Sequence, residues 1–328
     1  MKKVFVLLLM VLMVASIAFA NGGGESKKIE LAATTGGMSA DSPAGKGMAL
    51  FAQKVAEYSN GTIEIKVFYD TTLGNATSAI NGMVQGSVDL LVCGDSYYSS
   101  LVPEIQGFEL PYMFSSYAEA RETLAGKAGD YIDSKLQAKG IKALSFWEIG
   151  FRQLTNNKRE VNSPADLKGI KLRTLGAPAQ VKAWEAAGAI VTPMDVSELY
   201  SAIQQGVVDG QENPLSEIKA QRFYEVQKYM SLTAHVYTPM LFSCSTIAWD
   251  RLTAEQKEIL LKAAKDAQAE VYRINDANET SLLAEIKAAG VKVNENPDRE
   301  AFKAAMAPAA YEQFRAQNGN DMLAMLGK

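Results

Sequence analysis

Two arginines and one asparagine are the residues of this sequence best suited to bind a small anion. Arg152 lies in EIGFRQLTN, Arg173 in KGIKLRTLGAP and Asn213 in VVDGQENP. A guanidinium group donates two parallel hydrogen bonds to a carboxylate, which the ammonium group of lysine does not match. Together, the three side chains would bind the carboxylate of a small organic acid. The alternatives are solvated surface arginines and, for GQENP, a solvated turn.

The sequence offers little for catalysis. It contains no Gly-x-Ser-x-Gly elbow, no phosphate-binding loop and a single histidine, His235, which we expect to be structural. Without a Cys/His cluster we predict no metal and no cofactor. Cys93 and Cys244 lie in apolar segments and are predicted to be two buried thiols. Binding is therefore favoured over enzymatic activity, and an exported sugar-acid lyase or isomerase is the alternative.

The first twenty residues have the three parts of a secretory signal peptide. A basic start precedes the apolar run 4–19, and Ala18-Phe19-Ala20 is a cleavage site of small residues. The alternative, a membrane anchor, fits less well because the run is short for a bilayer. Asn21 stands where a lipoprotein would need cysteine. We expect cleavage near Ala20, a flexible leader over 21–28 and a periplasmic protein.

Charge and length limit the partners. The formal charge is −4, and removing two lysines with the signal peptide makes it −6 (−4 − 2), which argues against nucleic acid and anionic membrane surfaces as partners. The remaining chain of 308 residues (328 − 20) is long enough for two lobes with separate cores. We expect a monomer.

Alternating strand and helix patterns would position the candidate residues. Segment 29–32 predicts a strand, 44–58 a helix and 63–67 a second strand, which is typical of an α/β layer with a largely parallel sheet. In open α/β sheets ligands bind beyond the carboxyl ends of the strands. Polar residues that follow predicted strands are therefore candidates: Thr34, Asp95, Tyr97, the segment 148–152 after KALSFW, Arg173 and GQENP.

An internal repeat indicates two lobes of similar construction. Residues 83–89 read MVQGSVD and residues 203–209 read IQQGVVD, so that Gly, Val and Asp recur 120 positions apart. Each copy predicts a helix that ends at glycine and is followed by a strand containing Val88 or Val207-Val208. GQENP would then be the cleft-facing end of the second strand.

A long helix is predicted over 253–289. The segment opens with the capping box TAEQ and keeps a helical period, without glycine or proline, up to Gly290. At 1.5 Å per residue it would be about 55 Å long, more than the diameter of a small domain. It either breaks near 275–278 or crosses both lobes as one helix, and we favour the second.

Several motifs resemble those of one transport family. GFRQLTNNKREVNSPADLKGIKLRTLGAP and TPMDVSELYSAIQQGVVDGQENPLSEIKAQRFYEVQKY closely resemble solute receptors of tripartite ATP-independent periplasmic (TRAP) transporters, and FELPYMFSSYAEA, NGTIEIKVFYDTTLG and VQGSVDLL resemble their first-lobe motifs. The resemblance covers nearly all of the mature chain. It implies a two-lobed α/β periplasmic binding protein fold with a hinged cleft, which delivers its ligand to integral membrane permease subunits. The expected lobes are 29–149 plus 239–279 and 150–238 plus 280–315, with the long helix shared.

The resemblance also implies roles for individual residues. Arg173 matches the family's carboxylate-binding arginine, Arg152 a second arginine of the sialic-acid receptors, and Asn213 the asparagine of QENP. The expected distal pocket consists of Thr34, Asn75, Asp95, Tyr97, Trp147 and Asp195.

Departures from the family patterns narrow the expected ligand. Ala76, Gly94 and Tyr97 stand where sialic-acid receptors carry acidic and arginine side chains, which argues against sialic acid. Glu212-Asn213-Pro214 differs from the metal-dependent 2-oxoacid receptors, which supports the prediction of no metal. A hydroxylated sugar acid such as a uronate or aldonate is expected. A C4-dicarboxylate or another monocarboxylate is the alternative.

Overall fold

One mixed sheet runs through the whole molecule. The computed structural model describes residues 28–328, so the predicted signal peptide and all but the last residue of the leader lie outside the described residues. Within these residues ten strands join in the order β2-β1-β3-β9-β4-β7-β5-β6, with β8 beside β4 and β10 beside β8. The strands are β1 Ile29–Thr34, β2 Ile63–Phe68, β3 Leu90–Gly94, β4 Ile141–Asn156, β5 Lys171–Thr174, β6 Ile190–Pro193, β7 Gly210–Pro214, β8 Tyr229–Ser231, β9 Tyr237–Ser245 and β10 Lys292–Asn294.

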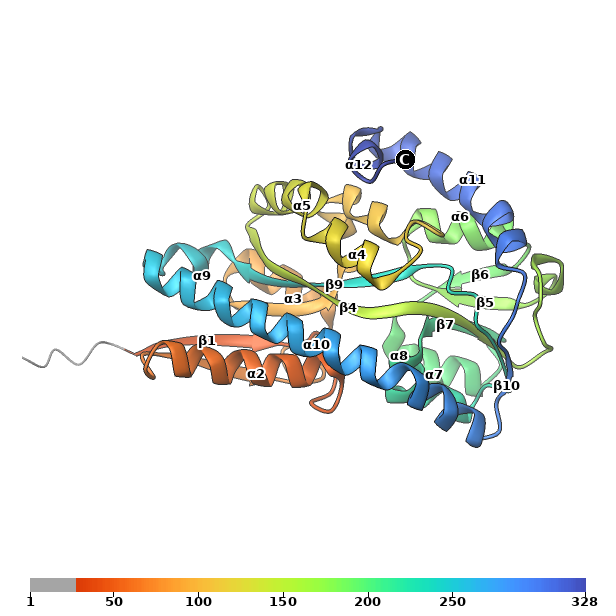
Figure 1. Ribbon diagram of the computed structural model, residues 1–328, viewed down its shortest axis with the longest axis horizontal. Helices are drawn as coiled ribbons and strands as arrows, with labels where there is room; N and C mark the ends of the chain where they lie inside the picture. Colours follow the sequence, from red (N-terminus) through yellow and green to blue (C-terminus); the bar gives the residue numbers. More distant parts are fainter. Residues whose placement is uncertain (1–27) are drawn as a thin grey trace, which may run out of the picture.

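The sheet has two parallel parts, one in each lobe. In lobe I, β1 pairs in parallel with β2 and β3; in lobe II, β5 pairs in parallel with β6 and β7. The antiparallel pair β4 and β9 joins them and crosses from one lobe to the other (Figure 1). The two-lobed α/β fold predicted from the sequence is confirmed.

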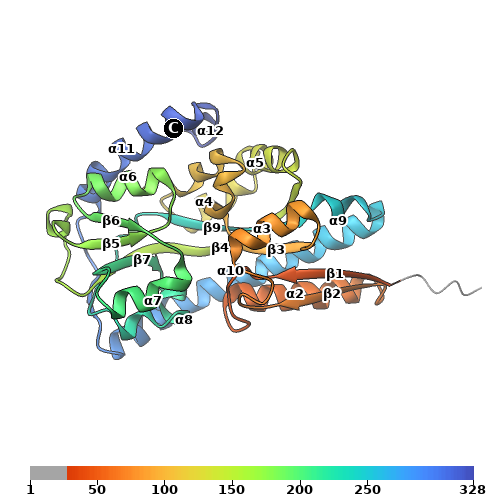
Figure 2. The ribbon, with the colours of Figure 1, turned by 180° about the vertical axis from the view of Figure 1, so that it is seen from behind.

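Helices cover both faces of the sheet. In Figure 1, α2 and α10 lie below the sheet of lobe I and α3, α4 and α5 above it. Seen from behind, α6 lies above the sheet of lobe II and α7 and α8 below it (Figure 2). The helices are α2 Pro43–Tyr58, α3 Ala76–Gln85, α4 Tyr117–Leu124, α5 Lys127–Gln137, α6 Pro178–Ala186, α7 Val196–Gln204, α8 Leu215–Ala220, α9 Thr246–Asp250, α10 Ala254–Ala288, α11 Arg299–Asn318 and α12 Asp321–Met325. The 3₁₀ turns are η1 Asp95–Ser100, η2 Pro103–Glu109, η3 Pro164–Leu167 and η4 Phe223–Glu225.

The internal repeat has the same structural role in both lobes. Asp89 accepts a hydrogen bond from the backbone N–H of Ala32 at 2.8 Å, and Asp209 accepts one from Lys171 at 3.0 Å. Each aspartate thus fixes the neighbouring parallel strand. The predicted strand position is wrong by two residues, because β3 begins at Leu90 and β7 at Gly210. GQENP is therefore a complete buried strand rather than the end of one.

Strand β4 also corrects a prediction. We expected the strand to end before Glu148, but it continues to Asn156 as the connection between the lobes. Two register shifts, one between Glu148 and Gly150, bend it, and Gly150 has a φ of +120° that other residues rarely adopt. Arg152 therefore lies inside a strand between the lobes and not in a loop.

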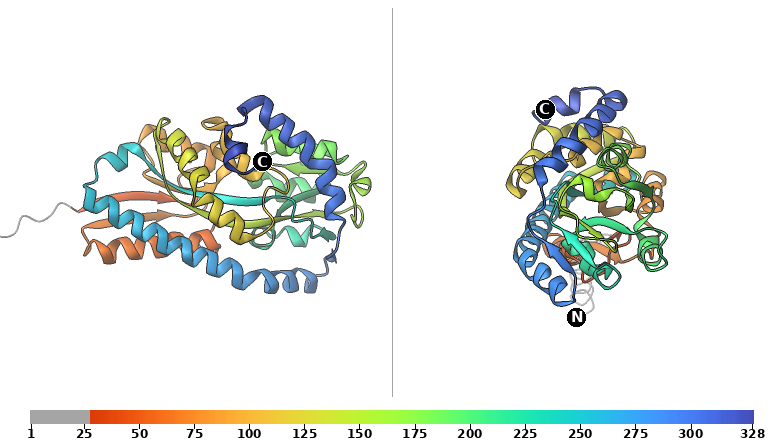
Figure 3. Two further views of the ribbon diagram at one scale, coloured as in Figure 1. Left: turned by 45° about the horizontal axis from the view of Figure 1, so that its top comes forward. Right: turned by 90° about the vertical axis from the view of Figure 1, so that its right-hand side faces the viewer.

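Helix α10 crosses both lobes without a break, as predicted. Thr253 and Gln256 form its capping box, and its 35 residues are continuous. Near its middle it approaches α2 so closely that a Cβ at Gly47 would lie 2.5 Å from Val271. At its far end Glu285 pairs with Lys219 of α8 at 2.8 Å. Figure 3 shows the helix running along the length of the molecule.

The C-terminal helices return to lobe I. Helix α11 lies over α6, and α12 continues to the upper face of lobe I (Figure 1). Phe314 and Met322 are buried there and pack against Gly107 of η2. Among the described residues no helix is both long and apolar enough to cross a membrane.

Candidate ligand-binding site

A small cavity lies where the two lobes meet at the strand ends. Its volume is about 70 Å³. The structure brings four of the predicted residues to it: Arg152, Arg173, Asn213 and Tyr97. The remaining lining residues are Gly36, Gly37, Met38, Cys93, Gly94, Ser96, Ile149, Leu175, Val196, Glu217, Gln221 and Thr238.

Arg173 is the most informative residue of the cavity. It is fully buried on β5, and its Nε donates to the carbonyl of Met194 at 2.9 Å. Its Nη1 and Nη2 have no hydrogen-bond partner among residues 28–328. Burial lowers the pKa of Arg173, and the largest opposing influence on it is the charge of Glu212, which is already paired with Arg152. Since buried charges are ordinarily paired, the free guanidinium edge indicates a binding position for an anion.

Arg152 is, by contrast, already neutralised within the protein. Its Nε and Nη2 bind the carboxylate of Glu212, its Nη2 donates to Asn213 Oδ1 at 2.9 Å, and its Nη1 donates to Thr238 Oγ1 at 3.1 Å. It lines the cavity, but the unpaired positive charge there belongs to Arg173. Sequence reasoning counted Arg152 with Arg173 among the carboxylate ligands because it did not identify Glu212 as the partner of Arg152.

Glu212 is held between two partners. His235 Nε2 lies 2.9 Å from Glu212 Oε2, and His235 Nδ1 lies 2.8 Å from the hydroxyl of Thr233. Burial would raise the pKa of Glu212, but Arg152 and His235 outweigh it and hold the pKa at about 2. Burial lowers the pKa of His235, so the ring is neutral and donates from Nε2 to the carboxylate. His235 has the structural role that we expected.

The polar residues of GQENP face the protein interior. Asn213 Nδ2 donates to Gln211 Oε1 at 2.5 Å, and Gln211 Nε2 donates to Thr155 Oγ1 at 2.7 Å. All five residues of the strand are buried. The alternative of a solvated turn is therefore excluded, and the network fixes the orientation of the Asn213 amide at the cavity wall.

Five predicted residues do not line the cavity. Asn75 and Asp195 are N-caps: their side chains accept from the backbone N–H of Ser78 at 3.0 Å and of Ser197 at 2.9 Å. Asparagine and aspartate are well suited to capping, and the resemblance that placed them in the distal pocket did not distinguish this role.

Thr34, Trp147 and Asp95 point into the protein. The hydroxyl of Thr34 accepts from Gly36 N at 3.4 Å. The indole of Trp147 is fully buried, with its ring centroid 5.0 Å from that of Phe242, because side chains alternate along β4 and this one faces the core. Asp95 is fully buried beside Glu109, just behind the cavity. These positions correct the predicted distal pocket.

Sequence reasoning missed the polar residues of α8. Glu217 and Gln221 line the cavity from the helix that follows β7 directly. Residues four apart share a helix face, so both point the same way. The position of Glu217 could have indicated this role, because it lies four residues after Asn213 and just beyond a predicted strand end.

Asp95 and Glu109 form a buried pair of carboxyl groups. Glu109 Oε2 accepts from Gln180 Nε2 at 2.9 Å, while Glu109 Oε1 and both oxygens of Asp95 have no hydrogen-bond partner in the described part of the chain. Burial, only partly offset by Arg152, raises the pKa of Glu109 to about 7. Burial and the neighbouring Glu109 also raise the pKa of Asp95. In the folded protein this pair therefore retains protons that exposed carboxyl groups would release.

The pair should make stability depend on pH. The folded protein keeps a proton on Glu109 up to about pH 7, whereas its ordinary pKa is 4.5. The stabilisation is complete below pH 4.5 and is lost as the pH rises through 7, so the free energy of unfolding should fall across that window. Urea denaturation from pH 4.5 to 8 would measure the slope. Glu109→Gln is expected to flatten it, and an unchanged slope in this variant would show that Glu109 is ionised in the folded protein.

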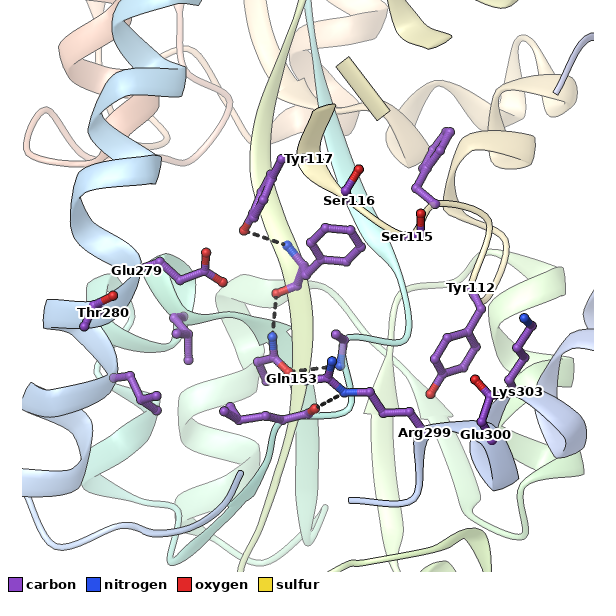
Figure 4. Close-up of a pocket in the computed structure, with 16 residues that line it drawn as sticks. Tyr112, Ser115, Ser116, Tyr117, Gln153, Glu279, Thr280, Arg299, Glu300 and Lys303 are labelled. Carbon is purple, nitrogen blue, oxygen red and sulfur yellow. Dashed lines mark hydrogen bonds between the residues drawn. The ribbon is translucent and has the colours of Figure 1, made fainter. Parts of the chain in front are cut away.

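A larger surface groove lies on another part of the molecule. Its volume is about 700 Å³, and it is lined by the loop before α4, β4, α10 and the start of α11. Figure 4 shows Glu279 and Thr280 on one side of it and Arg299 and Lys303 on the other. Arg299 Nε donates to Leu232 O at 2.9 Å. None of the residues lining this groove has an unpartnered buried polar atom. The smaller cavity is therefore the better candidate site.

Comparison with known proteins agrees with the site. The family described as bacterial extracellular solute-binding protein, family 7 (DctP), matches residues 35–317. The chain belongs to this family. The family is a transport solute-binding family, whose members bind small organic acids outside the cytoplasm and work with membrane permease components, and it is not a class of enzymes.

Individual relatives of this TRAP receptor have different ligands. It is 34% identical over 264 residues to the 2,3-diketo-L-gulonate-binding periplasmic protein YiaO of Escherichia coli, covering 80% of each chain. It superposes with a TM-score of 0.87 and 35% identity on the sugar acid binding protein DctPAm of Advenella mimigardefordensis in complex with galactonate, over 92% of this chain and 97% of that one. A receptor of Sulfurospirillum deleyianum with bound succinate matches with a TM-score of 0.84 and 31% identity, over 92% and 98%.

The donor set gives no indication of a metal in this receptor. Among residues 28–328 no group of three or more His, Cys, Asp and Glu side chains is arranged to hold a metal ion. Cys93 and Cys244 are both free and buried, as predicted. Burial raises the pKa of the Cys244 thiol to about 12, so it stays protonated at neutral pH.

Proposed function

We propose that this receptor captures a hydroxylated monocarboxylate, a sugar acid of the uronate or aldonate type, and delivers it to the permease of a TRAP transporter. The observation that carries the proposal is the free Nη1–Nη2 edge of Arg173 in the cavity between the lobes. That edge matches the two oxygens of one carboxylate. The periplasm is the proposed location and a monomer the proposed state.

The charges around the cavity favour one carboxylate over two. Arg152 and Arg173 are the two cationic side chains that line it, and Arg152 is paired with Glu212. Only Arg173 is left to neutralise a ligand charge, and Glu217 adds an acidic group to the wall. The galactonate-bound relative supports a sugar acid, and the succinate-bound relative keeps a C4-dicarboxylate as the second candidate.

Ligand entry requires the lobes to separate. The cavity of about 70 Å³ is well below the roughly 300–1,000 Å³ of typical small-molecule sites. Residues of both lobes line it, so the ligand would contact both only when they close around it. Closure would also remove water from Arg173, which strengthens its hydrogen bonds to the carboxylate.

A thermal-shift screen of the purified mature protein tests the proposal. D-galactonate, D-glucuronate, D-erythronate and succinate would be compared at equal concentration. A ligand at one hundred times its Kd stabilises the folded state by about 2.7 kcal/mol, which corresponds to roughly 5 °C or more in Tm. We expect such a shift with at least one sugar acid and a smaller one with succinate. A shift with succinate alone would favour the dicarboxylate, and no shift with any acid would contradict the proposal.

A further inference from the structure

One acidic residue of the cavity has no ionic partner. Glu217 is 9% exposed and belongs to α8, next to β7 and Asn213. It also lines the narrow gap that continues between the lobes toward Met38, Ser42 and Pro43 of lobe I. The residue therefore lies at the lobe interface, on the wall of the proposed ligand cavity.

The face of helix α8 opposite Glu217 packs against the protein and fixes the position of this residue. Leu215 and Ile218 are buried in the core of lobe II. The hydroxyl of Ser216 donates to the carbonyl of Ile149 on β4 at 3.3 Å. With these residues fixed, Glu217 and Gln221, one helical turn apart, face the cavity.

Two other buried glutamates near the lobe interface, Glu148 and Glu212, have ionic partners in the protein. Glu148 binds the guanidinium of Arg121 and the hydroxyl of Tyr237, and Glu212 binds Arg152 and His235. Glu217 forms no salt bridge with any residue between 28 and 328. Burial raises the pKa of Glu217, and the interaction with the Gln221 side chain and the charge of Arg152 offset this only partly. A buried carboxyl group without an ionic partner is costly, and a ligand that donates hydrogen bonds to it would lower this cost.

We infer that Glu217, with Gln221 beside it, is the specificity-determining residue that accepts hydrogen bonds from the hydroxyl groups of the ligand and disfavours a second carboxylate. This inference rests on the proposed function. A carboxylate accepts two hydrogen bonds side by side and thus suits neighbouring hydroxyl groups, while the Gln221 amide both donates and accepts. A dicarboxylate held by Arg173 would place its other charge in a cavity whose remaining acidic group repels it.

A simpler role for Glu217 is to stabilise the first turn of α8. Acidic residues are favoured near helix N-termini, and Glu217 lies in that turn. This role predicts a change in stability and no change in ligand preference. Selectivity between two acids therefore distinguishes the two roles.

Isothermal titration of Glu217→Gln with D-galactonate and with succinate tests the inference. The Kd for D-galactonate should rise about tenfold, since hydrogen bonds to a charged group are lost. The Kd for succinate should stay the same or fall, because the repulsive charge is gone. The ratio of the two constants should therefore change at least tenfold. Glu185→Gln is the matched control, since Glu185 lies in the same lobe and pairs with Lys182 on the surface.

Each outcome of the titration has one meaning. The melting temperature of ligand-free Glu217→Gln would show that the variant is folded. An unchanged ratio in the folded variant, or an equal loss for both acids, would overturn the inference while leaving the proposed function intact. If Glu217→Gln does not fold, Glu217→Ala gives the same comparison. Failure of the wild-type protein to bind any of the four acids of the thermal-shift screen would instead contradict the proposed function, and the inference with it.

Discussion

Arg173→Lys is expected to raise the Kd for the receptor's ligand by about 10- to 100-fold, the equivalent of one charged hydrogen bond of roughly 1.5–3 kcal/mol. The guanidinium of Arg173 bonds Met194 through Nε and leaves Nη1 and Nη2 free. A lysine ammonium group does not match the two oxygens of a carboxylate side by side. Titration calorimetry with the acid that gives the largest thermal shift would measure the change.

A second arginine of lobe II provides the control for this substitution. Arg159 is exposed and contacts the carbonyl of Lys168 at 3.5 Å, far weaker than the contacts of Arg173. Arg159→Lys should leave the Kd within a factor of two or so, as expected for an exposed side chain. An Arg173→Lys variant that binds as tightly as the wild type would mean that the carboxylate is held elsewhere.

Glu212→Gln is expected to destabilise the folded protein by about 3–5 kcal/mol, because it leaves a buried arginine without its counter-charge. Arg152 is 2% exposed and Glu212 1% exposed, so water compensates neither charge. Glutamine offers one acceptor oxygen where Glu212 offers two, so hydrogen bonds from Arg152 or His235 would also be lost. Urea or guanidinium denaturation at pH 7 would measure the change in the free energy of unfolding.

Two further variants test whether the loss of stability comes from the buried Arg152–Glu212 pair or from the loss of any ion pair. Glu225→Gln breaks the surface pair with Arg222 and should leave the free energy of unfolding nearly unchanged. Arg152→Met combined with Glu212→Leu removes both buried charges and should be more stable than Glu212→Gln alone. Equal stabilities of Glu212→Gln and the wild type would show that Arg152 finds another partner.

The elements that the sequence predicted best are those with local signals. The capping box at Thr253 and the uninterrupted helical period gave the long helix α10, and the repeated Gly-x-Val-Asp pattern gave the matching units of the two lobes. Arg173 was predicted from the chemistry of guanidinium groups and from family resemblance. Its free edge could not be predicted, because it depends on which carboxylates lie nearby in space.

The errors have a common physical cause. The ends of the strands and the family resemblance indicate where a ligand binds, but not the direction of each side chain. Trp147 faces the core, and Asn75 and Asp195 turn back to cap their own helices. The end of β4 was misplaced because the polar segment after KALSFW was read as following the strand, whereas Gly150 allows the strand to bend and continue. Glu217 was missed because it lies one turn into the following helix.

The central claim is that Arg173 holds the carboxylate of a small acid between the lobes. The most direct measurement is a crystal structure of the protein with the acid that most raises its melting temperature. We predict the two carboxylate oxygens at about 2.7–2.9 Å from Nη1 and Nη2 of Arg173. A structure in which these nitrogens remain without the ligand, while the acid lies elsewhere, for example in the groove of Figure 4, would contradict the claim.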